Sequence, residues 1–118
     1  MRIMKTTDIG DGLTVSAIGL GAMGMSAFYG SSDEKESIAT LRHAVDIGVT
    51  FIDTAEAYGP FENEKLIARA LGDRRHEVVL ATKASSETDD DGTVHGRNGT
   101  PAYIRKAAER SLRPSAPT

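Results

Sequence analysis

The sequence alternates between short β-prone runs and longer segments with helical periodicity. Helical patterns cover residues 33–48, 63–71 and 101–112, and the β-prone runs Val49–Thr54 and Glu77–Thr82 lie between them. Such alternation is typical of parallel α/β folds, because each helix carries the chain back across the sheet to begin the next parallel strand. The sequence therefore predicts an α/β fold built on a parallel sheet.

Local signals mark the ends of the predicted helices. Asp33 can accept a hydrogen bond as an N-cap, and Glu36 follows three residues later. Gly48 and Gly72 are natural C-terminal stops. Pro101 suits the first turn of a helix, because the N–H group that proline lacks is not needed there.

Two other parts of the chain have no helical pattern. Lys5–Ile9 and Leu13–Ile18 flank the turn Gly10–Gly12 and predict a β-hairpin, whose second run leads into a glycine segment. The stretch Ser85–Thr100 is polar and has no periodicity, so we expect a long loop there.

The composition fits one small globular domain. The chain has 118 residues, a hydrophobic fraction of 39% and a formal net charge of -3 without any basic block. We therefore expect neither nucleic acid nor a membrane surface as a partner. The absence of cysteine excludes a disulfide framework, and no apolar run has the length of a leader or a membrane span. These features lead us to expect a cytoplasmic protein.

Histidine and one tyrosine are expected to have ordinary structural roles. His43, His76 and His95 fall in three different predicted elements and share no metal-ligand spacing, so we expect no metal site. We expect Tyr103 to be a half-buried packing residue with a solvated hydroxyl group.

A glycine pattern raises the question of a dinucleotide-binding turn. Gly19, Gly21 and Gly24 spell G-x-G-x-x-G and resemble the glycine turn of β-hydroxyacid dehydrogenases. That fold needs a helix opening on the third glycine and an acidic residue about 20 residues later. Here the first good helix cap is Asp33, and Asp53 lies too far along the chain. We favour a loop at the end of a barrel strand, where small residues let a ligand approach the backbone, and keep the dinucleotide-binding fold as the alternative.

Three polar side chains follow the ends of predicted strands. Asp53 closes one strand, Tyr58 lies in the loop after it, and Lys83 closes the next strand. Because carboxyl ends of parallel strands meet at one rim, we expect these side chains to lie together. A lysine ammonium beside a phenol favours the phenolate, so the phenol becomes a better proton donor to a developing alkoxide. A carboxylate keeps such a lysine charged and oriented. The set predicts an acid catalyst for carbonyl reduction.

At these positions the chain resembles the aldo-keto reductases. The strings FIDTAEAYG (51–59), NE (63–64), ATK (81–83) and NGTPAYIRKAAERSLR (98–113) occur in the order found in that family. The resemblance implies the N-terminal portion of a (β/α)8 TIM barrel with a preceding β-hairpin. Residues 1–118 would form a partial barrel domain of one hairpin and three strand-helix units. The implied activity is reduction of a small carbonyl substrate, an aldehyde or ketone, with NADPH (NADP).

The resemblance also implies residue roles. Tyr58 would be the general acid, Lys83 the cation beside it, and Asp53 the carboxylate bound to that lysine. The residues implied to lie near the cofactor are Gly21, Ala22, Met23 and Asp53. The fourth catalytic residue of the family, a histidine after the fourth strand, has no counterpart in these 118 residues.

Two alternatives belong to other classes of function. The chain could be a non-catalytic binding or regulatory protein on the same scaffold, because a fold does not fix a function. It could also be half of a split enzyme that pairs with a C-terminal complementing half through open strand edges. We expect little or no turnover by the chain alone. The atypical tail Pro114–Thr118 departs from the usual continuation of the family, and we interpret it as the product of a shifted reading frame.

Overall fold

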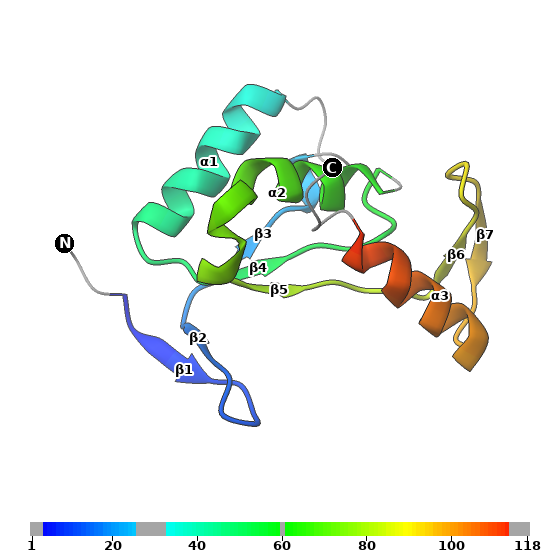
Figure 1. Cartoon of the computed structure of the whole chain (residues 1–118), viewed down its shortest axis with the longest axis horizontal. Coiled ribbons are helices and arrows are strands. Elements are labelled where there is room, and N and C mark those ends of the chain that lie inside the picture. Colours follow the sequence, from blue (N-terminus) through cyan, green and yellow to red (C-terminus); the bar gives the residue numbers. More distant parts are fainter. Residues whose placement is uncertain (1–3, 26–32, 60, 114–118) are drawn as a thin grey trace.

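The centre of the molecule is a three-stranded parallel sheet (Figure 1). A computed structural model describes residues 4–25, 33–59 and 61–113. The atypical tail, residues 114–118, lies outside the described residues. The strands are, in spatial order, β3 (Leu20–Gly21), β4 (Phe51–Asp53) and β5 (Val79–Ala81). The predicted α/β fold with a parallel sheet is confirmed, and the three strands do not close into a barrel.

The register of the sheet aligns the carboxyl ends of its strands. Gly21 pairs with Asp53, and Asp53 pairs with Ala81. The segments that follow these three residues therefore leave the sheet at the same rim. Gly19, just before β3, has a role in packing: a Cβ atom there would lie 3.1 Å from the carbonyl oxygen of Phe51. Glycine at this position lets the chain approach β4 closely.

Two helices cover one face of the sheet (Figure 1). They are α1 (Glu34–Asp46) and α2 (Glu62–Leu71). Asp33 caps α1 as predicted, because its carboxylate accepts a hydrogen bond from the Glu36 N–H at 3.3 Å. The helices and the sheet enclose a cluster that we call the apolar core: Ala22, Leu41, Val45, Ile52, Ile67, Ala70, Leu71 and Val78.

The predicted hairpin is present and is separate from the parallel sheet. Its strands β1 (Thr6–Asp8) and β2 (Thr14–Ser16) are antiparallel. Ser16 connects it to the amino-terminal side of β4: the Ser16 N–H donates to Thr50 Oγ1 at 2.7 Å, and the Thr50 N–H donates to Ser16 Oγ at 2.9 Å. Figure 1 shows the hairpin at the end of the molecule opposite to β6 and β7.

The prediction of a long loop over residues 85–100 is wrong in part. The segment contains an antiparallel ribbon of β6 (Ser86–Thr88) and β7 (Val94–Arg97). Its turn is closed by the Asp89 N–H, which donates to the Thr93 carbonyl at 2.8 Å. Because β7 is exposed along its whole length, it has no alternating apolar pattern from which it could be predicted.

The third helix, α3 (Pro101–Leu112), lies beside the ribbon at the carboxyl end of the sheet (Figure 1). Its predicted bounds are confirmed. Thr100 caps it by accepting a hydrogen bond from the Tyr103 N–H at 3.3 Å. Two short 3-10 helices, η1 (Met23–Met25) and η2 (Gly72–Glu77), complete the described elements. None of the described helices combines the length and apolar character needed to cross a bilayer.

Candidate active site

Lys83 occupies the centre of the site, at the carboxyl rim of the sheet. Its Nζ atom donates hydrogen bonds to Asp53 Oδ2 at 2.8 Å, to the Thr54 carbonyl oxygen at 2.9 Å and to the Tyr58 hydroxyl at 3.1 Å. The structure thus brings together the three side chains that the sequence places after strand ends. The Thr54 carbonyl is a further acceptor that a reading of side-chain types could not identify.

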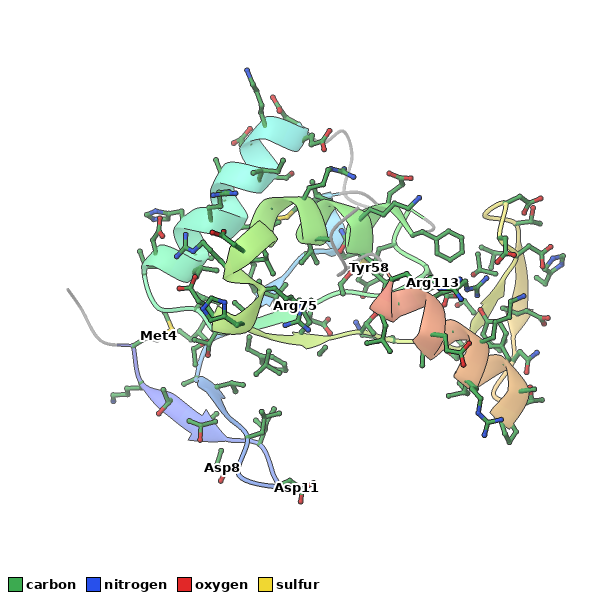
Figure 2. All side chains as sticks on the ribbon, in the orientation of Figure 1. Met4, Asp8, Asp11, Tyr58, Arg75 and Arg113 are labelled. Atoms are coloured by element: carbon green, nitrogen blue, oxygen red, sulfur yellow. The ribbon has the colours of Figure 1, made fainter. Side chains whose placement is uncertain are left out.

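The loop after β4 turns Tyr58 back toward Lys83. The Tyr58 N–H donates to the Ala55 carbonyl, and the Glu56 N–H donates to the Lys83 carbonyl at 3.3 Å. Gly59 follows with φ of 64°, a conformation that glycine adopts without steric cost. In Figure 2, Tyr58 lies far from Asp8, which marks the hairpin at the other end of the molecule.

The charge on Lys83 is favoured by its partners. Partial burial acts to lower its pKa, but hydrogen bonds to Asp53 and Tyr58 outweigh burial, so the pKa of Lys83 is raised above its ordinary value. The ammonium also lies 5.0 Å from the centroid of the Tyr58 ring. About half of each side chain of the Lys83–Asp53 pair is exposed, so a small molecule could reach it from solvent. The arrangement can stabilise a phenolate and can therefore support proton donation by Tyr58.

Asn63 connects two strand ends to the start of α2. Its side chain is fully buried: Oδ1 accepts from Thr54 Oγ1 at 2.6 Å, and Nδ2 donates to the Ala22 carbonyl at 2.6 Å. The next residue, Glu64, accepts a hydrogen bond from Thr82 Oγ1 at 2.8 Å. The sequence string NE therefore holds the ends of β3, β4 and β5 in place through side chains of one helical turn.

Three residues expected near the cofactor lie at the same rim but differ in accessibility: Gly21, Ala22 and Met23. Gly21 is exposed, and a Cβ atom there would meet nothing within 4 Å. Met23 is half-buried in η1. Ala22 is fully buried within the apolar core, so its methyl group cannot line a cofactor surface, although its N–H donates to the Asp53 carbonyl at 3.0 Å. A contact of Ala22 with a cofactor stays a prediction and would have to come from its main chain.

The alternative of a dinucleotide-binding turn does not match the structure. Gly24 lies within η1, a single turn of 3-10 helix, and does not open an α-helix. Among the described residues, the next α-helix begins at Glu34, after the Asp33 cap. Gly24 therefore does not supply the α-helix N-terminus on which such a turn binds phosphate.

The expectation for Tyr103 is wrong. Its hydroxyl is not solvated but buried, and it donates to Glu56 Oε1 at 2.6 Å. Arg110 joins the same contact, with Nη2 at 3.1 Å from Glu56 Oε1. The sequence carried no signal for the contact of Tyr103 and Arg110 with Glu56, because this contact depends on α3 packing over the loop after β4.

The three histidines lie at exposed positions in separate parts of the fold. His43 is on α1, His76 Nδ1 lies 3.0 Å from the Asp73 carbonyl oxygen, and His95 Nε2 lies 2.6 Å from Asp89 Oδ2. Among the described residues, no group of three or more histidine, aspartate or glutamate side chains could hold a metal ion.

The fold and the site define a parallel α/β protein with a lysine–tyrosine–carboxylate set at the carboxyl rim of its sheet. The family model for the aldo/keto reductases matches residues 17–114, which is most of the sequence. The chain belongs to the aldo/keto reductase family.

Solved structures of aldo-keto reductases resemble this chain closely. The holo form of a Bacillus halodurans enzyme is 29% identical with a TM-score of 0.83, over 95% of this chain and 36% of its own length. A putative enzyme of Pseudomonas aeruginosa is 32% identical with a TM-score of 0.78, over 93% and 42%. A Klebsiella pneumoniae enzyme in complex with NADPH is 31% identical with a TM-score of 0.74, over 97% and 36%. The chain thus spans well under half the length of these proteins.

Proposed function

We propose that this chain carries the proton-donating part of an NADPH-dependent oxidoreductase that reduces aldehydes or ketones to alcohols. The observation that carries the proposal is the contact of Lys83 Nζ with both Asp53 and the Tyr58 hydroxyl. Membership of the aldo/keto reductase family and the likeness to an NADPH complex support it. In this proposal residues 1–118 form one part of a barrel domain, the hairpin followed by three strand-helix units.

The open rim next to Asp53 is compatible with a nicotinamide ring. Gly21 is paired with Asp53 across the sheet and presents no side chain, so a flat ring could lie against its backbone. We assign Gly21, Met23 and Asp53 as the residues of this chain that would contact the cofactor. NADPH bound there would supply the hydride for the carbonyl carbon.

The residues of the chain would supply the matching proton. Tyr58 would donate its hydroxyl proton to the carbonyl oxygen as that oxygen gains negative charge, which yields the alcohol and a tyrosinate. The Lys83 ammonium would stabilise the tyrosinate until solvent returns a proton. Asp53 would keep Lys83 charged and directed toward Tyr58, in agreement with the raised pKa of Lys83.

The proposal is tested in two proteins. The 118-residue chain alone, assayed for aldehyde-dependent NADPH oxidation, is expected to show little or no turnover. A chimaera in which residues 17–113 replace the corresponding part of the Klebsiella pneumoniae enzyme is expected to turn over. Lys83→Met and Tyr58→Phe should each lower its kcat by about 10²-fold or more. Lys65→Met is the matched control, because Lys65 is an exposed lysine on α2. A chimaera that keeps its kcat after both changes at the site would refute the proposal.

A second candidate, half of a split enzyme, is favoured by the edge of the sheet. In the described part of the chain, β5 pairs only with β4, so its other edge has no strand partner. An unpaired edge is a template for another strand. Mixing the chain with a separately expressed C-terminal segment of the Klebsiella pneumoniae enzyme should then restore NADPH oxidation. Stoichiometric association without turnover would instead favour a binding or regulatory protein.

A further inference from the structure

The Tyr103 hydroxyl joins two chain segments that carry the candidate catalytic residues. It donates to Glu56 Oε1 at 2.6 Å and lies 3.0 Å from the Ser86 carbonyl oxygen. It accepts hydrogen bonds from the Thr88 N–H at 2.9 Å and from Arg110 Nη2 at 3.2 Å. A hydroxyl has one proton and two lone pairs, so the bonding capacity of this group is fully used. We call these five residues the Tyr103 cluster.

The Tyr103 cluster is closed to solvent at its centre. Glu56 and Tyr103 are 1% and 6% exposed, and the Arg110 side chain is 11% exposed. Burial, followed by the hydrogen bond to Glu56, raises the pKa of Tyr103, so its hydroxyl stays protonated. The Arg110 guanidinium also lies 5.0 Å from the centroid of the Phe61 ring. The Tyr103 hydroxyl is fully bonded and buried, and such a group holds a fixed geometry. Elsewhere in the cluster, Glu56 Oε2 and Arg110 Nε are buried without a hydrogen-bond partner.

The cluster residues are close in sequence to the site. Glu56 precedes Tyr58 by one intervening residue, and Ser86 follows shortly after Lys83. The main chain of Glu56 also joins the loop after β4 to the segment after β5, because its N–H donates to the Lys83 carbonyl. The Glu56 carbonyl accepts a hydrogen bond from the Phe61 N–H at 2.8 Å, which closes the loop around Tyr58.

We propose that Tyr103, acting through Glu56 and the Thr88 N–H, is a positioning residue that sets the separation between the Tyr58 hydroxyl and the Lys83 ammonium. An effect of Tyr103 on catalysis rests on the proposed function. Its effect on the contact between Tyr58 and Lys83 can be tested without measuring turnover. Tyr103 itself makes no contact with the reacting atoms. Its hydroxyl holds the loop after β4 against the segment after β5, and these segments present the two partners to each other.

The test measures how the reactivity of Lys83 depends on pH in the complete 118-residue chain. Only the neutral amine reacts with acetic anhydride, and the other lysines serve as internal references in mass spectrometry. Because the bond to Tyr58 helps to raise the pKa of Lys83, losing it should lower that pKa and speed acetylation at a given pH. Tyr103→Phe should shift the Lys83 profile in the same direction as Tyr58→Phe. Asp90→Asn is the control, because Asp90 bonds only the exposed side of Arg110.

A second variant keeps the test valid if Tyr103→Phe does not fold. Glu56→Gln retains the size of the side chain and an acceptor oxygen but weakens the bond to the hydroxyl, and it should shift the Lys83 profile less. The proposal is overturned if the folded Tyr103→Phe or Glu56→Gln chain keeps the wild-type profile while Tyr58→Phe changes it.

Turnover of the chimaera separates this inference from the proposed function. Tyr103→Phe should lower kcat by about 10-fold with little change in KM, because misplacing a catalytic group affects the chemical step more than binding. Unchanged kcat in Tyr58→Phe would refute the proposed function and leave the acetylation result as a test of positioning. Reduced kcat in Tyr58→Phe with unchanged kcat in Tyr103→Phe would refute the positioning role alone.

Discussion

The α1–α2 side of the sheet and the α3 end of the molecule are held by different kinds of contact. On the first side, α1 and α2 bury aliphatic residues such as Leu41 and Ile67 against Ile52 of β4. At the other end, α3 contributes no residue to the apolar core and buries only Tyr103 and Ala107. Its contacts with the loop after β4 include hydrogen bonds and an ion pair to Glu56 and the stacking of Arg110 over the Phe61 ring.

The two kinds of contact constrain geometry to different degrees. Aliphatic cores accept substitutions that conserve volume, because dispersion and burial have little direction. Buried polar clusters require particular distances and angles, and losing one partner leaves another unsatisfied. The Tyr103 cluster joins the chain segments that carry Tyr58 and Lys83, where the position of Tyr58 matters. The difference suggests that the apolar core provides stability and the Tyr103 cluster provides local geometry.

Removing volume from the apolar core should have the largest effect. Ile52→Ala should lower the free energy of unfolding by about 4 kcal/mol, because it removes a fully buried side chain and leaves a cavity. Urea unfolding followed by circular dichroism measures it. Ile18→Ala, at a side chain 69% exposed, should change stability by less than about 0.5 kcal/mol. Equal losses in the two variants would contradict the assignment of the core.

Removing the buried cation of the Tyr103 cluster should have the second-largest effect on stability. Arg110→Met should cost about 3 kcal/mol, because Glu56 keeps a buried carboxylate without its partner. Amide hydrogen exchange should show lost protection in α3 and β6–β7 and retained protection in α1. Arg105→Met, at an exposed arginine of the same helix, is the matched control. Loss of protection spread equally over α1 and α3 would mean that the two regions are not distinct.

Removing helix caps should have a smaller and local effect on each region. Thr100→Ala should weaken α3 by about 1 kcal/mol, and Asp33→Ala should weaken α1 by a similar amount, since each leaves an N–H group without its acceptor. Hydrogen exchange in the first turn of each helix reports the change. Thr100→Ser keeps the hydroxyl and should preserve protection; if it does not, the cap is not the cause.

The smallest predicted effect is a pH dependence of the exposed ribbon. The hydrogen bond to Asp89 raises the pKa of His95, so its stabilising contribution is complete below the unfolded pKa and is lost as pH rises through the folded pKa. The ribbon should therefore be slightly better ordered at mildly acidic pH than at alkaline pH. Nuclear magnetic resonance titration of the His95 ring measures its pKa in the folded chain, and Asp89→Asn should return that pKa toward the ordinary value of histidine. An unchanged pKa in that variant would rule out Asp89 as the cause of the shift.

Local sequence signals predicted much of this fold. The start of α3 was predicted from Pro101, which suits the first turn of a helix, and in the structure Thr100 caps that turn. The meeting of Asp53 with Lys83 was also predictable, because parallel strands in register place their carboxyl ends at one rim.

The features that sequence reasoning missed depend on contacts between distant segments. The helix α2 begins at Glu62, within one residue of its expected start, but the bonds of the Asn63 side chain to Thr54 and Ala22 were not expected. Burial of Ala22 and the contact of Tyr103 with Glu56 likewise require the packed structure. No local pattern encodes such long-range partners.

A double-mutant cycle on kcat in the chimaera tests most directly whether Tyr58 and Lys83 act as one proton-donating unit. The measurement compares Tyr58→Phe, Lys83→Met and the double variant with the parent chimaera in NADPH-dependent aldehyde reduction. If the two groups act together, the double variant will be about as slow as the slower single variant, because the second change removes nothing that still functions. A double variant slowed by the product of the two single effects would contradict a joint role for these residues.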